Sequence, residues 1–409
     1  MNKNQKALID ILNKSIRQEK ISLIHKNLDW EYILNESKEH KITGLTYIGL
    51  NKKYINEVMS EKILKLWKRE ILNESLYQMN HINNVLEILE IFYENQIPVI
   101  VLKGLVLRYY YPNPYLRTMS DADILVHENN LKKCSELMES IGYKIIEESE
   151  SHGAHIVFRK PGKLNVEIHW TIVNDDFFKG SKAFEKHIWD NAIKVELEGV
   201  KCLALSLEDL ITHLFIHMAT HIVSSGFGIR QLLDLVILIE KEAKNINWHK
   251  VIINISECGI LKFSIVILNI CNSLFNIDIP TEVKELDNVG EKYNGFVIED
   301  ILESGVHGRK NRSMIFAREF TFDKKEGASL STIDILKKMI LLIFPEVDSM
   351  DSKYEYAKKI RLLTPIAWVH HLISGIFHKE YSLKNKINML MFTVCKSKKR
   401  NKLIRELEL

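Results

Sequence analysis

The chain has 409 residues, of which 46% are hydrophobic and 27% are charged, and its formal net charge is +3. These proportions are typical of a folded globular protein, and the length indicates two or three domains. A charge so close to neutrality supplies no global positive field, so we do not expect long nucleic acid as a partner.

The first 96 residues are predicted to be helical, because apolar residues recur at spacings of three and four positions. The clearest stretch is 55–96, which contains no proline or glycine. We expect one or two long helices there, ending near Asn95 and before Pro98.

A different pattern begins at Pro98. Residues 98–102 form a short, continuously apolar run, as expected for a strand buried on both faces. Further strands are expected at 122–126, 143–148, 155–159, 164–170, 193–197 and 200–203, and helices at 105–110 and 130–141. This order predicts an α+β core, with a mixed β-sheet and helices packed on it.

From Ser206 the pattern is helical again, with Ser206 as N-cap and two acidic residues in the first turn. Helices are expected at 206–222, 229–243, 247–257 and 260–275, and the rest of the chain is expected to be mostly helical. The predicted organisation is an N-terminal helical region at 1–96, a core at 97–205 and a C-terminal helical region at 206–409.

Cysteine spacing and apolar runs bear on the compartment. The five cysteines are far apart and form no CxxC pair, which argues against a disulfide framework and a cysteine zinc site. The first 15 residues have the pattern of an amphipathic helix and lack the apolar run of a signal peptide. No stretch reaches about 18 uninterrupted apolar residues. We therefore expect a cytoplasmic protein without a membrane partner.

Three acidic residues form the first candidate site. Asp121 and Asp123 lie two positions apart at the start of a predicted strand, so their side chains share a face. Acids this close repel each other unless a cation neutralises them, and Mg²⁺ prefers oxygen ligands. Glu167 and His169 share the polar face of the strand 164–170. If the two strands are neighbours, three carboxylates converge on one or two metal ions; otherwise the aspartates are surface acids at a strand entry.

Residues with phosphate-binding chemistry flank this acidic group. Lys103 and Gly104 stand between a predicted strand and a predicted helix, where a cation, a close backbone and free N–H groups attract anions. Arg117 either clamps a phosphate with its planar guanidinium or forms an ion pair that holds the aspartate loop. Lys103 is otherwise an ordinary lysine at a strand end. Ser120 either caps a turn or contacts a ligand, and His169 is a further candidate for substrate contact.

A second polar group lies on the predicted helices after residue 206. His213, His217 and His221 are four residues apart, and so are Arg230 and Asp234 on the next helix. One interpretation is a cleft wall that contacts substrate, and two histidines at this spacing can also bind zinc. The other interpretation is a polar seam between packed helices, in which each histidine has a local partner.

Three motifs together resemble a known superfamily. VLKG at 101–104, RTMSDADILV at 117–126 and VEIHW at 166–170 are similar to motifs of the nucleotidyltransferase superfamily, which includes polymerase β, aminoglycoside nucleotidyltransferases and minimal toxin-type transferases. The match is best to a poorly characterised bacterial branch. The resemblance implies two aspartates on one strand of a small mixed sheet, a third acid on a neighbouring strand, Mg²⁺, and a nucleoside triphosphate donor. Lys103-Gly104 stands where many members have Gly-Ser, and Glu167 where Asp is commoner.

The expected activity is transfer of a nucleoside monophosphate from a nucleoside triphosphate to an acceptor hydroxyl or phosphate, with Mg²⁺ or Mn²⁺. The acceptor is expected to be a peptide, a protein or a small molecule, and members of the branch also occur among peptide-tailoring systems. One alternative is metal-dependent glycosyl transfer from a nucleotide sugar to a peptide on the same scaffold. Another is a non-catalytic nucleotide-binding module.

Overall fold

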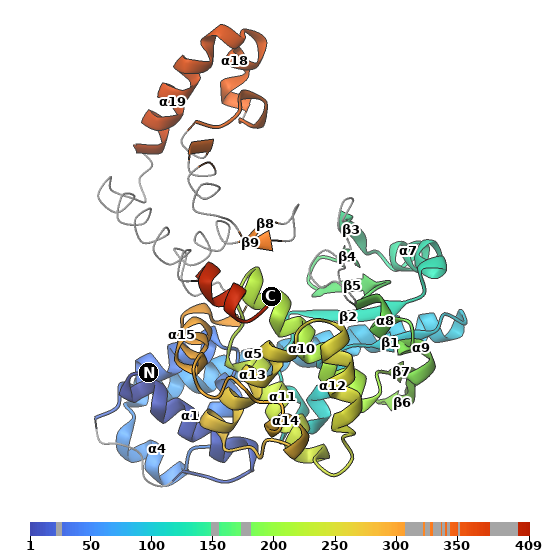
Figure 1. The fold of residues 1–409 in the computed structure, drawn as a ribbon, viewed down its shortest axis with the longest axis vertical. Coiled ribbons are helices and arrows are strands. Elements are labelled where there is room, and N and C mark those ends of the chain that lie inside the picture. The colour runs from blue at the N-terminus through green and yellow to red at the C-terminus, as the bar shows by residue number, and fades with distance from the viewer. Residues whose placement is uncertain are drawn as a thin grey trace. The chain divides into compact units, whose positions relative to one another are not determined.

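The protein is described by a computed structural model that covers residues 1–21, 27–148, 155–172, 181–306, 322–323, 328–329, 337, 340–341, 344–350, 352–376 and 400–409. The chain divides into two compact units. The first comprises Met1–Ile222, Gly226–Lys310 and Glu408–Leu409, and the second comprises Val223–Ser225 and Asn311–Leu407. The β-sheet and the polar residues singled out above all belong to the first unit (Figure 1).

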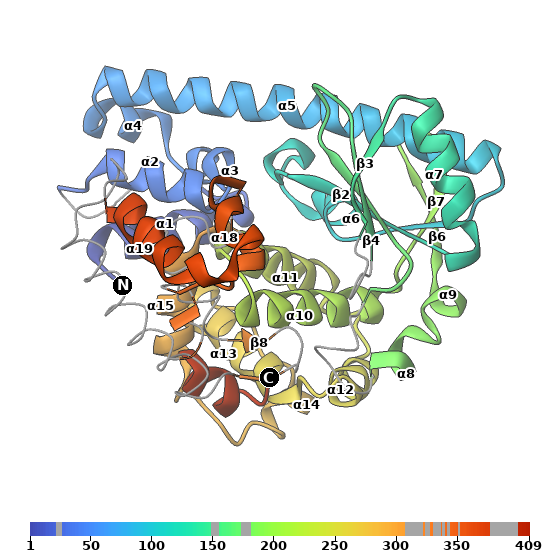
Figure 2. The same ribbon diagram turned by 90° about the horizontal axis from the view of Figure 1, so that it is seen from above.

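Helices form the N-terminal part of the first unit, as predicted. They are α1 (Lys3–Ile16), α2 (Trp30–Glu39), α3 (Thr43–Ile48), α4 (Lys52–Val58) and α5 (Glu61–Glu94). The long helix α5 begins at the N-cap Ser60 and ends with Asn95 as C-cap, which confirms the predicted end. Figure 2 shows α5 extending from the N-terminal helices to the sheet. This helix contacts α2 and α3 as well as the strands β1 (Val99–Val101) and β7 (Val200–Ala204).

A seven-stranded mixed sheet follows, which confirms the predicted fold class. Its strands are β1 (Val99–Val101), β2 (Asp121–Val126), β3 (Lys144–Glu148), β4 (His155–Arg159), β5 (Asn165–His169), β6 (Ile193–Leu197) and β7 (Val200–Ala204). The order across the sheet is β3-β4-β5-β2-β1-β7-β6. The β2–β5 and β1–β7 pairs are parallel, and the other pairs are antiparallel. Short helices connect the strands: α6 (Gly104–Leu107), α7 (Leu131–Ser140), α8 (Ser181–Glu185) and α9 (Ile188–Asn191).

The two faces of the central strands differ in polarity. Ala122, Ile124 and Val126 of β2 are buried, together with Val166 and Ile168 of β5. These side chains pack against apolar residues of α5 and α7 in one core cluster. Burying each such side chain contributes about 1.5–3 kcal/mol, so the alternation along both strands fixes which face is apolar. The acidic residues between them are thereby held on the opposite face.

Helices also follow the sheet. They are α10 (Leu207–Val223), α11 (Ile229–Glu242), α12 (Trp248–Glu257), α13 (Leu261–Phe275), α14 (Thr281–Lys284) and α15 (Asn294–Ser304). The first four lie within two residues of their predicted bounds. Ser206 caps α10, since the backbone N–H of Asp209 donates to Ser206 Oγ at 3.3 Å.

The second unit contains the strand pair β8 (Phe322–Asp323) and β9 (Ala328–Ser329), and the helices α18 (Glu355–Lys359) and α19 (Thr364–Ile376). Residues 400–406 are also helical. A small core of Met350, Tyr354, Ala357 and Ala367 is buried in this unit. In the part of the chain that the structure describes, we find no helix with the length and apolar character needed to cross a bilayer.

Candidate active site

The three acidic residues lie on one face of the sheet. Because β2 and β5 are parallel neighbours, Asp123 stands opposite Glu167 and Asp121 stands opposite Asn165. All three carboxylate side chains line one cavity of about 170 Å³. Glu167 is therefore on the same side of the sheet as the aspartate pair.

The cavity brings together most of the residues singled out from the sequence. Those that line it are Lys103, Gly104, Arg117, Asp121, Asp123, Glu167, His217, His221, Arg230 and Asp234. Ser120 and His169 do not line the cavity but contact residues that do. Ser120 Oγ donates to Asp121 Oδ1 at 3.3 Å, and His169 Nε2 lies 3.1 Å from Asp123 Oδ1.

Lys103 joins β1 to α6 in a strained backbone conformation. Its φ of 40° and ψ of −107° are costly for a residue with a Cβ, by about 1–3 kcal/mol. The conformation places Lys103 Nζ 3.3 Å from Asp123 Oδ2. Backbone strain of this kind concentrates at functional sites, and here it sets a cation beside the acids.

Gly104 is needed for packing. A Cβ at this position would overlap Arg117 Nη1 and the Met119 side chain. The glycine therefore allows the segment before β2 to lie directly over the start of α6. This helix has only four residues, so it offers a few backbone N–H groups but little dipole.

The two aspartates have opposite pKa shifts. Burial, and then the nearby charges of Asp123 and Glu167, raise the pKa of Asp121 to about 6. Burial also favours a higher pKa for Asp123, but Lys103 and then His169 outweigh it, so the pKa of Asp123 is lowered. Burial lowers the pKa of His169, yet its contacts with Asp123 and Glu167 raise it overall. Lys103 and His169 thus both contact Asp123. Among the described residues, no cationic side chain lies equally close to Asp121.

Arg117 forms a buried bidentate ion pair with Asp234 of α11. Its Nε lies 3.1 Å from Asp234 Oδ1 and its Nη2 lies 2.7 Å from Oδ2. Tyr111 also donates its hydroxyl to Asp234 Oδ1, at 2.8 Å. Burial lowers the pKa of Arg117, but Asp234 raises it above its ordinary value. The sequence left two interpretations of Arg117, a phosphate clamp and an ion pair, and the structure shows an ion pair. Its partner, Asp234, lies on a helix more than a hundred residues later.

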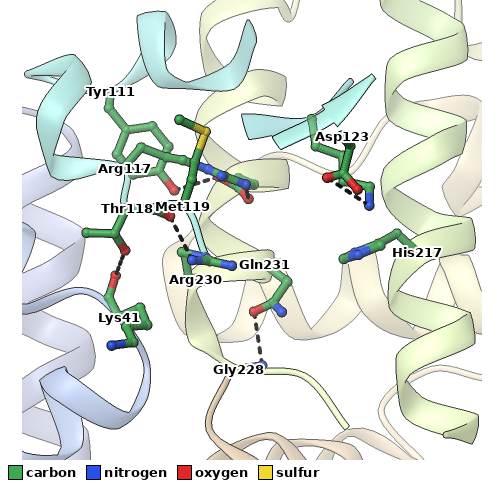
Figure 3. Close-up of polar contacts among 12 residues, drawn as sticks. Lys41, Tyr111, Arg117, Thr118, Met119, Asp123, His217, Gly228, Arg230 and Gln231 are labelled. Carbon is green, nitrogen blue, oxygen red and sulfur yellow. Dashed lines mark hydrogen bonds and ion pairs between the residues drawn. The ribbon is translucent and has the colours of Figure 1, made fainter. Parts of the chain in front are cut away.

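Arg230 is a second buried guanidinium in the cavity wall. Its Nη1 donates to the backbone carbonyl of Thr118 at 2.7 Å, one residue after Arg117. Its Nε is buried and has no hydrogen-bond acceptor among the described residues. Burial and the charge of Arg117 lower its pKa. Figure 3 shows Arg230 between Thr118 and His217, and Arg230 is one of the residues that line the cavity.

The three histidines of α10 differ in environment. His217 and His221 line the cavity, with their Nε2 atoms 3.1 Å apart. His213 is 3% exposed, and neither of its ring nitrogens has a hydrogen-bond partner among the described residues. Burial, and then the charge of Lys103, lower the pKa of His213 to about 3. In the described chain the three do not form a group with the spacing of a zinc site.

Two contributions to the site were not predicted from the sequence. Gln78 of α5 binds both backbone groups of Met119: its Nε2 donates to Met119 O, and its Oε1 accepts from Met119 N–H, each at 2.8 Å. Gln78 precedes Ile82 by four residues, so it is a polar residue on the apolar stripe of the helix, and this position is the signal that could have identified it. His155 begins β4, in agreement with the strand expected at 155–159, but the 3.9 Å approach of its Nε2 to Glu167 Oε2 was not predicted. His152, which precedes this strand, lies outside the described residues.

One comparison with known proteins shows the family. Residues 26–276 match the sequence profile of a family described as uncharacterised nucleotidyltransferase. A search of curated proteins finds no significant match.

Solved structures give matches of low overall similarity. The antibiotic-resistance factor ANT(2'')-Ia is 13% identical, with 44% of this chain and 91% of that chain covered and a TM-score of 0.32. The lincosamide antibiotic adenylyltransferase LnuA, bound to lincomycin, is 18% identical, with 38% and 94% covered and a TM-score of 0.29. A CCA-adding enzyme in complex with CTP is 11% identical, with 81% and 98% covered and a TM-score of 0.20. At these scores the likeness carries no argument about substrate.

The profile match covers more than half of the chain and includes all three acids of the cavity. The chain therefore belongs to this nucleotidyltransferase family and is a transferase enzyme.

Proposed function

We propose that the enzyme transfers a nucleoside monophosphate from a nucleoside triphosphate to an acceptor hydroxyl or phosphate, with Mg²⁺ or Mn²⁺ held by Asp121, Asp123 and Glu167. The observation that carries the proposal is the register of β2 against β5, which sets the three carboxylates on one wall of a cavity that also contains cationic side chains. Such a combination of acids for metal and cations for phosphate is what phosphoryl chemistry requires.

The donor set suits a hard divalent ion. Carboxylate oxygens are the ligands that Mg²⁺ and Mn²⁺ prefer. The raised pKa of Asp121 reflects its burial and then the charges of the neighbouring acids Asp123 and Glu167. When bound, such an ion polarises phosphoryl oxygens and neutralises the charge that develops on them. The three acids would hold it.

Cationic side chains on two walls would bind the triphosphate. Lys103 approaches from the β1–α6 junction, and Arg230 approaches from α11 with a buried Nε–H that has no acceptor among the described residues. Arg117 adds its charge at the cavity wall, while Asp234 uses two of its nitrogens and Nη1 lies toward Gly104. Backbone N–H groups near Gly104 would complete the phosphate contacts.

The proton of the acceptor hydroxyl would pass to Glu167. His169 Nε2 lies 3.1 Å from Asp123 Oδ1, so it orients this carboxylate, and it is 3.6 Å from Glu167 Oε2. Ser120 supports Asp121 in the same way through its hydroxyl. A base held within hydrogen-bond reach of the attacking hydroxyl contributes about 10²–10⁴-fold to the rate of such reactions.

The helical wall opposite the sheet would select the acceptor. His217, His221, Arg230 and Asp234 line it, and their mixture of imidazoles and charges suits a polar peptide, protein side chain or small molecule. In this proposal residues 1–96 support the core at 97–205, and the helices after 206 form the acceptor side of the cleft. The proposed nucleoside triphosphate donor fits the cytoplasmic location expected from the sequence.

The test is a transfer assay with purified full-length protein. Each α-labelled nucleoside triphosphate is incubated with Mg²⁺ and host lysate, and the modified product and released pyrophosphate are identified. We expect label transfer and pyrophosphate release by the wild type, and loss of both by at least about 100-fold in Asp121→Asn and Asp123→Asn. Asp278→Asn, which alters an exposed acid on the same unit, is the matched control and should retain full activity.

Two results would contradict the proposal. Wild-type transfer rates in both aspartate variants would refute the metal assignment. Release of a nucleoside diphosphate from a nucleotide sugar, with no pyrophosphate from any triphosphate, would replace nucleotidyl transfer by glycosyl transfer.

A further inference from the structure

A group of two imidazoles and one carboxylate includes Glu167, which lines the cavity. His155 is the first residue of β4, and Glu167 and His169 belong to β5. The antiparallel register places His155 directly opposite His169, with their ring centroids 4.9 Å apart. Side chains two residues apart on a strand share a face, so Glu167 projects on the same side as both histidines.

The three side chains are close enough to bind a single ion. His155 Nε2 lies 3.9 Å from Glu167 Oε2, and His169 Nε2 lies 3.6 Å from the same oxygen. One ligand atom from each residue falls within 4.8 Å of the others. Ligands at about 2.1 Å from a tetrahedral metal ion are about 3.4 Å apart, so small side-chain rotations suffice to complete the set.

This group is tighter than the three-acid group. Among the residues that the structure describes, His155, Glu167 and His169 are the set of three or more metal-binding side chains that meets this spacing. Asp121, Asp123 and Glu167 share a face and a cavity, but their carboxylates do not gather within the same distance. Of these two groups, the one whose ligand atoms already lie close together therefore offers two nitrogen ligands, from His155 and His169.

Nitrogen ligands discriminate between metals. Mg²⁺ binds oxygen and dehydrates reluctantly, whereas imidazole suits the divalent first-row transition metals. Two histidines with one carboxylate are a known ligand set for Zn²⁺ and for Fe²⁺. The donor chemistry of this group selects against Mg²⁺.

A fourth ligand is available from the neighbouring strand. Asp123 Oδ1 is 3.1 Å from His169 Nε2, while the other oxygen of Asp123 faces Lys103. Asp123 thus presents one oxygen to the histidine group and one to the side of the cavity that holds the lysine. An ion between His155 and His169 would lie beside Asp123 without displacing Lys103.

We propose that His155, Glu167 and His169 bind a divalent first-row transition-metal ion, with Asp123 Oδ1 as an adjacent ligand. The inference rests on the proposed function, because Glu167 is shared with the catalytic acids, and it adds the class of metal used at that end of the site. The ion class is Mn²⁺ to Zn²⁺, whereas Mg²⁺ would bind only at the three carboxylates of Asp121, Asp123 and Glu167.

The first test is metal binding by the metal-free full-length protein, with Co²⁺ as the probe. We expect one Co²⁺ per chain to give visible d–d absorption that millimolar Mg²⁺ does not remove. His155→Asn should weaken Co²⁺ binding by at least about 10-fold. His127→Asn, which changes a histidine stacked on Trp189 away from the cavity, is the matched control and should bind Co²⁺ as the wild type does.

The second test uses the unaltered protein, so it does not depend on the folding of a variant. Pulsed electron paramagnetic resonance of the Mn²⁺-loaded wild type should show ¹⁴N couplings from coordinated imidazole. Absence of nitrogen coupling, or wild-type Co²⁺ binding by a folded His155→Asn protein, overturns the inference. Asp121→Asn separates it from the proposed function: that variant should lose nucleotidyl transfer but keep the Co²⁺ spectrum.

Discussion

At the residue scale, the main electrostatic feature of the site is that the pKa of Asp121 is raised while the pKa of Asp123 is lowered. Their spacing in the sequence predicts that they share a face, and the structure places both on the cavity wall. The sequence does not indicate that Lys103 and His169 both contact Asp123, because those contacts depend on the strain at Lys103 and on the register of β5. Asp121 is left as the buried acid with a raised pKa.

The raised pKa gives a stability prediction with a defined sign. The pKa of Asp121 rises from 3.8 to about 6 on folding, so folding favours its protonated form. This contribution to stability is complete below about pH 4 and is lost as the pH rises through about 6. Without divalent metal, Asp121→Asn should therefore be more stable than the wild type at pH 7.5, by on the order of 3 kcal/mol.

Urea unfolding at pH 4 and pH 7.5 measures this effect. The stabilisation by Asp121→Asn should disappear at pH 4, and the exposed-site variant Asp278→Asn should show no difference at either pH. A variant less stable than the wild type at pH 7.5, or equally stabilised at both pH values, would show that Asp121 is not an unfavourably buried carboxylate.

At the scale of elements, α11 holds the segment that leads into β2. Asp234 binds Arg117, and Arg230 binds the carbonyl of Thr118, so two side chains one helical turn apart secure two consecutive residues. Gln78 of α5 secures the next residue, Met119, from the other direction. The four-residue spacing predicts that Arg230 and Asp234 share a face of α11. It does not predict their partners, because Arg117 lies 117 residues before Asp234 in the sequence.

Breaking the ion pair should be costly. Asp234→Asn leaves the Arg117 guanidinium buried without a charged partner, and losing one member of such a pair typically destabilises a protein by about 3–5 kcal/mol. Glu240→Gln on the same helix removes a partly exposed ion pair with Arg17, for which about 1 kcal/mol or less is expected. Urea unfolding at pH 7 compares the two. Equal losses would mean that the buried pair contributes no more than a surface pair.

At the scale of the molecule, one compact unit contains the sheet and helices from both sides of it in the sequence. The C-terminal half of α5 belongs to the core beneath the sheet, since Ile82, Val85, Leu89 and Phe92 pack in the same cluster as the strands. The acids therefore stand on a rigid support in which α5, β2 and β5 share one core. A site built on such elements holds its ligands in place more precisely than one built on loops.

The mixed sheet, the long helix and the first four helices after the sheet could be predicted, because each has a clear apolar period or a capping residue. The acidic face could be predicted because apolar and polar residues alternate regularly along β2 and β5. Contacts between distant segments could not, among them Arg117 with Asp234, Gln78 with Met119 and His155 with Glu167. Each depends on tertiary packing and register that a single sequence does not encode locally.

The most direct test of the central claim is a crystal structure of the full chain with Mn²⁺ and a non-hydrolysable nucleoside triphosphate analogue, with anomalous data collected for manganese. The account predicts an anomalous peak within coordination distance of carboxylate oxygens from Asp121, Asp123 and Glu167, with the triphosphate between this ion and Lys103. A bound nucleotide with no ion at these three carboxylates, or a Glu167 side chain turned to the opposite face of the sheet, would contradict it.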